Sequence, residues 1–213
     1  MKLYYWPGAC SLSPHIVSRE AGIDLQLAEL DRAERKTQDG TVLSTVNPKN
    51  QVPVLELDNG QRLTEGPVIV QYLADQKPGS GLVPPPGTME RYRVQEWLNF
   101  ITSELHKLVF IPLLSHKSND GAKAFARDQI GPRFAYLNAH LTGRDYLLDR
   151  FTVADAYLVT VLNWTRPTGI ELTQWPALHA YFRRMHQRES VAKAFAEEMA
   201  LYQEEQARAA AAA

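Results

Sequence analysis

Cysteine is nearly absent from this sequence, which holds only Cys10 among its 213 residues. One cysteine cannot form an internal disulfide, so the chain fits a reducing compartment and carries a free thiol. The first residues lack the long apolar stretch and small-residue cleavage site of a secretory signal. No apolar run approaches the roughly 20 residues needed to span a bilayer. We therefore expect a cytoplasmic protein that does not associate with membranes.

The sequence also has no excess of charge of either sign, because it holds 23 lysines and arginines and 24 acidic residues, for a net charge of −1. No overall field favours nucleic acid as a partner. The six histidines show no zinc-binding spacing. Neither a G-x-S-x-G nucleophile turn nor a G-x-x-x-x-G-K-[ST] phosphate loop occurs. We therefore predict no nucleic-acid partner and no metal ion.

Short apolar runs alternate with helical stretches over residues 1–77. The turn Asn59-Gly60 between two apolar runs is the strongest short-range signal of a β-hairpin. Residues 31–50 are polar and ambiguous, and we expect an irregular helix and a loop there. The other predicted elements are a strand at 2–6, a helix at 11–21, a strand at 24–30, a hairpin at 52–65 and a helix at 66–76. This β-α-β-(α)-β-β-α order predicts a small α/β domain.

The rest of the chain reads as helical. Residues 78–88 are rich in proline and glycine and form a predicted linker. Beyond it, strand signals vanish and 89–213 is predicted to be an all-helical domain. Thr152 and Asp155 have the spacing of a helix capping box. The predicted helices lie at about 89–115, 120–141, 153–166, 175–187 and 189–205.

Cys10 follows the Pro7-Gly8 turn and precedes the predicted helix at 11–21, which Ser11 or Ser13 could cap. Free N–H groups and the helix dipole at such a position favour a thiolate. The alternative is a small buried apolar residue, which free cysteine often is. Position 13 is serine, so Cys10 can form a mixed disulfide with a small thiol but no internal redox disulfide.

Two backbone positions could bind a peptide-like ligand. If the Val52-Pro53 bond is cis, the N–H and C=O of Val52 are free to pair with an extended ligand. An ordinary edge-strand proline is the alternative. Gly66 opens a helix whose free N–H groups suit a carboxylate, and Glu65 beside it suits an ammonium. The alternative here is a helix start stabilised by a first-turn acid.

These motifs, in this order, resemble the N-terminal domain of glutathione transferases. The stretches "MKLYYWPGACSLSPH" (1–15), "WLNFITSELHK" (97–107) and "FTVADAYLVTVLNW" (151–164) look like the bacterial beta class in particular. The resemblance spans residues 1 to about 200. It implies a thioredoxin-like N-terminal domain, a cis Val52-Pro53 bond, a helical C-terminal domain, a homodimer and a cytoplasmic location.

The resemblance also implies a glutathione site. Cys10 would lie beside the glutathione sulfur, the Val52 backbone would pair with the cysteinyl part, and Glu65 with Gly66 would hold the γ-glutamyl end. Arg35 stands where a lysine usually reaches the glycyl carboxylate, with Lys36 as an alternative. Many glutathione transferases have serine where Gly66 stands. From the C-terminal domain the implied contacts are Asn99, Ser103, Glu104, Leu105 and His106.

Helical spacing gives a partial check of that last group. The predicted helix carries an apolar stripe of Val94, Leu98, Ile101, Leu105 and Leu108. At about 100° per residue, Asn99, Ser103 and His106 form a second stripe roughly 150° away. A solvated face is one interpretation of it. The resemblance instead implies a face that borders the cleft, with His106 as a neutral or cationic donor near the glutathione sulfur.

The resemblance implies that the protein conjugates the glutathione thiolate to hydrophobic electrophiles. We expect the electrophile site around residues 106–116 and 164–170, where apolar and aromatic side chains are frequent. A thiolate on Cys10 would repel the glutathione thiolate. We therefore predict that Cys10 forms a mixed disulfide and that His106 supports conjugation. The alternatives are a glutathione-dependent thiol-disulfide reductase or peroxidase using Cys10, and a non-catalytic binding protein.

Overall fold

A computed structural model describes residues 1–211, which group into two compact units. The first unit holds Met1–Leu82 together with the chain from Glu189 onward, and the second holds Val83–Arg188. The boundary between Leu82 and Val83 falls inside the predicted linker at 78–88, where a 3-10 turn at Pro78–Ser80 precedes it.

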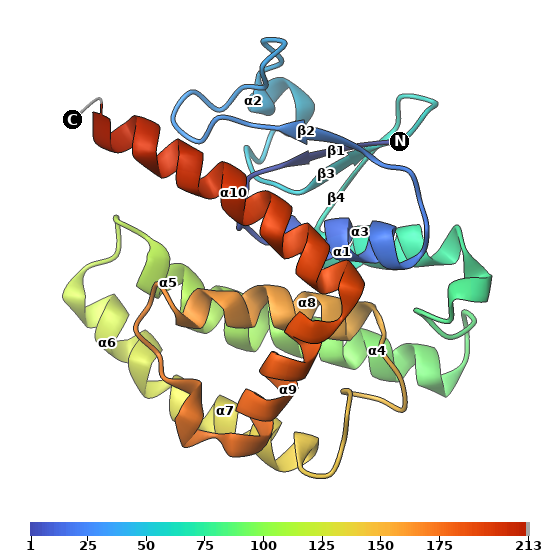
Figure 1. The fold of residues 1–213 in the computed structure, drawn as a ribbon, viewed down its shortest axis with the longest axis vertical. Helices are drawn as coiled ribbons and strands as arrows, with labels where there is room; N and C mark the ends of the chain where they lie inside the picture. Colours follow the sequence, from blue (N-terminus) through green and yellow to red (C-terminus); the bar gives the residue numbers. More distant parts are fainter. Residues whose placement is uncertain (212–213) are drawn as a thin grey trace. The chain divides into compact units, whose positions relative to one another are not determined.

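The first unit is built on a four-stranded sheet in the order β2-β1-β3-β4 (Figure 1). Strand β1 runs parallel to β2 and antiparallel to β3, and β3 pairs with β4 as the predicted hairpin. Helices α1 and α3 lie against one another on one face of the sheet. The mixed α/β fold predicted from the sequence is confirmed. The elements are β1 (Lys2–Tyr5), α1 (Leu12–Glu20), β2 (Gln26–Glu29), α2 (Leu43–Val46), β3 (Val54–Glu56), β4 (Arg62–Thr64) and α3 (Gly66–Asp75).

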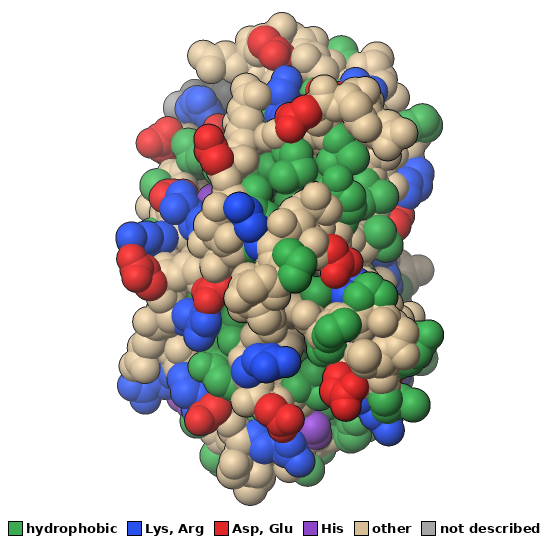
Figure 2. All heavy atoms as spheres, turned by 90° about the vertical axis from the view of Figure 1, so that its right-hand side faces the viewer, with side chains coloured by type: hydrophobic (Ala, Val, Ile, Leu, Met, Phe, Trp, Pro, Cys, Tyr) green, Lys and Arg blue, Asp and Glu red, His purple; other side chains and the backbone are tan. Residues whose placement is uncertain are grey.

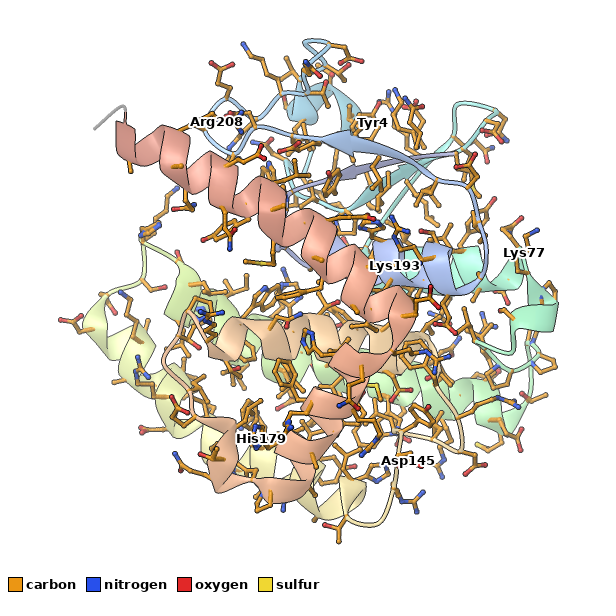
Figure 3. All side chains as sticks on the ribbon, viewed as in Figure 1. Tyr4, Lys77, Asp145, His179, Lys193 and Arg208 are labelled. Carbon is orange, nitrogen blue, oxygen red and sulfur yellow. The ribbon has the colours of Figure 1, made fainter. Side chains whose placement is uncertain are left out.

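The aromatic residues of β1 alternate between the two faces of the sheet, as strand geometry requires. Tyr4, labelled in Figure 3, is buried with residues of α2 and with Val52 and Val54 in one apolar cluster. Tyr5 faces α1, with its ring centroid 6.5 Å from that of His15. Both tyrosines are therefore core residues, as their strand position suggests.

Helix α10 (Glu189–Ala211) packs against α1 and belongs to the first unit. Lys193 and Arg208 mark its course in Figure 3. The Ser190 hydroxyl donates a 2.5 Å hydrogen bond to Glu20, and Arg19 pairs with Glu197. The predicted domain at 89–213 thus differs from the second unit at its C-terminal end. Contacts between residues about 170 positions apart decide this grouping, and no local pattern reveals them.

The second unit is helical throughout. Helix α8 is buried along its whole length and contacts α4, α9 and the segment that follows α4. The predicted capping box is present, since Thr152 accepts from the backbone of α8 and Asp155 accepts from the Thr152 N–H. No helix within residues 1–211 is long and apolar enough to cross a membrane. The helices are α4 (Met89–Phe100), α5 (Ile111–Leu114), α6 (Asp120–Asp128), α7 (Ile130–Leu141), α8 (Val153–Leu162) and α9 (Pro176–Gln187), with 3-10 turns at Asn163–Thr165 and Leu172–Gln174.

Residues Ile101–Phe110 form a π-helix, which the sequence did not indicate. At its end the Ile111 N–H bonds to the His106 carbonyl, five residues earlier. At its start the hydroxyls of Thr102 and Ser103 donate hydrogen bonds to the carbonyls of Leu98 and Asn99, at 2.8 and 2.9 Å. Such side-chain bonds compete with the regular ladder. The wider turn changes which side chains face the core.

Candidate functional site

Cys10 lies just before the first turn of α1 and is partly exposed. Its Sγ donates to the Val52 carbonyl at 3.4 Å. The prediction that Ser11 or Ser13 caps α1 is wrong, because no side chain caps this helix. The Ser11 hydroxyl instead bonds to both the N–H and the C=O of Trp6, which folds the turn before Cys10. The Leu12 and Ser13 N–H groups at the start of α1 bond instead to the carbonyls of Ala9 and Cys10, at 3.1 and 3.3 Å.

The Val52-Pro53 peptide bond is cis, as the resemblance implies. Val52 is 9% exposed and precedes β3. Its N–H bonds to no residue of the described chain, while its carbonyl accepts only from the Cys10 thiol. Both polar groups of one peptide-like edge therefore lie beside the thiol, and the N–H is free to bind a ligand carbonyl.

Helix α3 begins directly against this proline. A Cβ placed on Gly66 would lie 3.8 Å from Pro53 Cγ, which is ordinary contact. Glu65, just before the helix, has a φ of 70°, a conformation that side chains other than glycine rarely adopt. Its exposed carboxylate pairs with Lys49, whose Nζ also bonds to Thr64 Oγ1 at 2.8 Å. The structure thus brings the start of α3 next to the Val52-Pro53 turn.

Arg35 and Lys36, the two alternatives for a ligand carboxylate, point to different places. The guanidinium of Arg35 lies over the Trp6 ring, 6.0 Å from its centroid. Lys36 pairs with Glu34 at 2.6 Å and lines a groove of about 860 Å³ along β2, the edge strand of the sheet. Cys10 and Val52 do not line that groove. Of the two cations, Arg35 is therefore the one placed toward the Cys10 turn.

Helix α10 contributes a buried acid that sequence reasoning missed. Glu198 is 1% exposed and accepts from the Gly8 N–H at 2.9 Å and contacts His15 Nδ1 at 3.0 Å. Burial raises the pKa of Glu198, and the hydrogen bond from His15 opposes that shift. Because Gly8 precedes Cys10 by two residues, this acid holds the thiol-bearing turn. Glu198 is one of several glutamates in α10, and nothing in the sequence distinguishes it from the exposed ones.

His106, from the second unit, is buried at 6% exposure. Its Nδ1 lies 2.7 Å from the Tyr157 hydroxyl, and its ring packs edge-on against Trp164 with centroids 4.9 Å apart. Burial, followed by the charge of Lys107, lowers the pKa of His106 to about 3. The imidazole is therefore neutral at physiological pH. Of the two forms predicted from the sequence, only the neutral donor fits.

The predicted polar stripe divides. Asn99 and Ser103 are exposed, whereas His106 faces the core. The expectation that the three share one face is wrong, because the π-helix turns more slowly than the α-helix assumed. Leu105 is fully buried, and Glu104 bonds to Arg133 at 2.5 Å. Neither therefore presents a free polar side chain.

The apolar stretches predicted to bind an electrophile are only partly open. Phe110 and Trp164 are buried, and Ile111 is exposed. A crevice of about 340 Å³ in the second unit is lined by Gly169 and Ile170 from the predicted 164–170 stretch, together with Arg127, Ile130, Gly131, Glu171, Gln174 and Trp175. No group of three His, Cys, Asp or Glu residues among the described positions is arranged to hold a metal ion. Figure 2 shows acidic and basic side chains intermixed on the face in view.

The chain combines a thioredoxin-like sheet, a thiol before the first helix, a cis-proline turn beside that thiol and a helical second unit. These features define a class of protein, and comparison with known families identifies the class. The N-terminal domain of glutathione S-transferases matches residues 8–76, and the C-terminal domain of the same family matches residues 101–189. The chain belongs to the glutathione S-transferase family.

Individual relatives agree with this assignment. Glutathione S-transferase GstA of Escherichia coli O157:H7 is 42% identical over 93% of this chain and 98% of its own length. The structure of a bacterial beta-class glutathione S-transferase from Sphingomonas chungbukensis matches with a TM-score of 0.89 and 43% identity, covering 93% and 98% of the two chains. A sphingomonad enzyme solved in complex with glutathione matches with a TM-score of 0.88 and 46% identity, again over 93% and 98%. The resemblance to the beta class is confirmed.

Proposed function

We propose that the protein conjugates glutathione to hydrophobic electrophiles and that Cys10, Val52 and Gly66 form the floor of the glutathione site. The observation that carries the proposal is the 3.4 Å contact between Cys10 Sγ and the carbonyl of Val52, whose N–H has no acceptor among residues 1–211. A cysteinyl residue in extended conformation pairs with such an edge through its backbone. Its thiol then lies beside Cys10.

Each end of the tripeptide has a complementary group. The Gly66 N–H at the start of α3 and the Glu65 carboxylate suit the carboxylate and ammonium of the γ-glutamyl end. Pro67 has no N–H, and the Val68 N–H bonds to the Glu65 carbonyl at 3.0 Å. Glu65 is already oriented by Lys49. The Arg35 guanidinium suits the glycyl carboxylate and can bind it through two hydrogen bonds. We further propose, from the resemblance, that Asn99, Ser103, Glu104 and Leu105 contribute the remaining contacts.

Conjugation requires the glutathione thiol as a thiolate. Its pKa is near that of ordinary cysteine, about 8.5, and lowering it by about two units takes roughly 2.7 kcal/mol of stabilisation. The start of α1 and a few donors can supply this much. The Cys10 thiol donates a hydrogen bond to the Val52 carbonyl, and this contact favours a neutral Cys10. A neutral thiol does not repel the glutathione thiolate, whereas a second thiolate would. We further propose, from the resemblance, that the neutral His106 is one of the donors, and it would donate through Nε2 because its Nδ1 contacts the Tyr157 hydroxyl.

The test replaces Cys10 with alanine and measures conjugation to an aromatic halide. We expect the variant to retain conjugation within severalfold of the wild type. A complete loss of rate with glutathione binding intact in calorimetry would contradict this division of roles. Absence of glutathione binding by the wild-type protein would contradict the proposed function itself and favour a non-catalytic protein.

The same variant tests the mixed disulfide. The neutral Cys10 thiol first loses its proton to solvent, and the resulting thiolate attacks one sulfur of oxidised glutathione. A Cys10–glutathione disulfide forms, and the other glutathione leaves as a thiolate that takes up a proton. We expect intact-mass spectrometry to show one glutathionyl adduct on the wild type and none on Cys10→Ala. Turnover of a model mixed disulfide that Cys10→Ser abolishes would instead favour the reductase.

The assembly and location of the protein are also proposals. We propose a homodimer, because the resemblance implies one, and expect sedimentation equilibrium to give twice the mass of the 24.0 kDa chain. A cytoplasmic location rests on the same resemblance and on the single free thiol. Cell fractionation would test it.

A further inference from the structure

Trp6, four residues before Cys10, carries two guanidinium groups over its ring. Arg32 Cζ is 5.6 Å and Arg35 Cζ is 6.0 Å from the ring centroid. Both distances are within reach of a cation–π attraction, for which tryptophan is the strongest side chain. The two arginines differ in what else they bind.

The Arg32 guanidinium binds two other groups. Its Nη2 donates to the Pro7 carbonyl at 2.7 Å, and its Nε donates to Glu205 at 3.3 Å. The Arg35 guanidinium makes no hydrogen bond or ion pair with any residue of the described chain. Its backbone is fixed, because its N–H bonds to Asp31 and its carbonyl accepts from Leu43, each at 2.8 Å. Only the side chain of Arg35 is free to move, and Trp6 is the group that it contacts.

Trp6 is itself held rigidly to the thiol turn. Its N–H and C=O bond to Ser11, and its carbonyl also accepts from Ala9 at 3.1 Å. Its side chain packs against the apolar cluster that contains Val52. The indole Nε1 is buried and has no partner within residues 1–211, so Trp6 is not placed to maximise its own hydrogen bonding. The ring therefore forms a fixed platform between the Cys10 turn and Arg35.

We propose that Trp6 is a positioning residue that presents Arg35 to the C-terminal carboxylate of the thiol substrate, and so selects glutathione over γ-glutamylcysteine. This inference rests on the proposed function. A guanidinium lies flat on an indole and keeps its edge donors free for a carboxylate, whereas an ammonium has no such plane. The tryptophan and the arginine, which stands where the family usually has lysine, thus act as one pair.

The test measures Kd by calorimetry and kcat and KM for conjugation with glutathione and with γ-glutamylcysteine. We expect Trp6→Leu to raise Kd and KM for glutathione by about fivefold, the size of one exposed cation–π contact, with kcat within twofold of the wild type. For γ-glutamylcysteine, which lacks the glycyl carboxylate, the same variant should change neither constant. In an Arg35→Met background, Trp6→Leu should have no further effect.

Controls separate positioning from folding. Trp6→Phe keeps one aromatic ring and loses the rest of the indole with its unpartnered N–H, so it should weaken glutathione binding by less than Trp6→Leu. Arg93→Met removes an exposed guanidinium from the second unit and should change nothing. The inference is overturned, while the function stands, if the Trp6 variants bind glutathione and γ-glutamylcysteine with equally reduced affinity. It is also overturned if both variants bind glutathione as tightly as the wild type does. A wild type that binds neither substrate overturns the function instead.

Discussion

The buried imidazole of His106 makes the stability of the protein depend on pH in a defined direction. A histidine in an unfolded chain has a pKa of about 6.5, while burial lowers the pKa of His106 to about 3 in the folded protein. Between these values the unfolded state binds a proton that the folded state does not. The free energy of unfolding therefore rises with pH across this window, and stability is lost as pH falls from about 6.5 toward 3.

The magnitude follows from the same two values. The slope approaches 1.36 kcal/mol per pH unit where only the unfolded state is protonated. Between pH 7 and pH 5 the wild type should lose about 2 kcal/mol of stability through this one residue. His106→Gln replaces the imidazole with a group that does not titrate and can still bond to the Tyr157 hydroxyl. The variant should lack this part of the acid sensitivity.

Urea unfolding at several pH values between 5 and 7 measures the effect. The difference in unfolding free energy between pH 7 and pH 5 should be about 2 kcal/mol smaller for His106→Gln than for the wild type. His116→Gln, which removes an exposed histidine, should keep the wild-type slope. If the free energy of unfolding depends on pH in the same way for the wild type and for His106→Gln, the reasoning is refuted. His106 could then be cationic in the folded protein.

Two further predictions concern the thiol turn. Glu198→Leu removes the buried carboxylate that accepts from the Gly8 N–H and contacts His15 Nδ1, and should destabilise the protein by about 3–5 kcal/mol in chemical unfolding. Glu198→Gln keeps an acceptor and should cost clearly less, so equal losses would contradict this role. Gly66→Ser should fold normally, because a Cβ there lies at an ordinary contact distance of 3.8 Å from Pro53. Its hydroxyl should lower the Kd for glutathione severalfold in calorimetry. A higher Kd would show that the start of α3 does not face the ligand.

Local patterns in the sequence predicted the local structure well. The Asn59-Gly60 turn and the Thr152–Asp155 capping box are contained within a few residues, and both are present. Their partners lie within hydrogen-bonding reach along the chain, so the residue types nearly determine the geometry. The cis Val52-Pro53 bond has no such local signature, and it was expected only through family resemblance.

The position of His106 shows where a periodic pattern fails. An assumed 3.6-residue turn places it with Asn99 and Ser103 on one face. The Thr102 and Ser103 hydroxyls bond to carbonyls four residues earlier, and both residues lie at the start of the π-helix Ile101–Phe110. This winding rotates His106 into the core. The hydroxyl pair was visible in the sequence, but it occurs in many regular helices and does not by itself predict the change.

The Pro7-Gly8 peptide, two residues before Cys10, shows a second limit. Arg32 donates to its carbonyl and Glu198 accepts from its N–H, so both polar groups of one peptide unit are held. Arg32 in turn bonds to Glu205, so both contacts lead to α10. The thiol at the start of α1 is therefore fixed by acids near the other end of the chain. Motifs identify which residue carries the chemistry, whereas contacts about 190 residues apart decide where its sulfur lies.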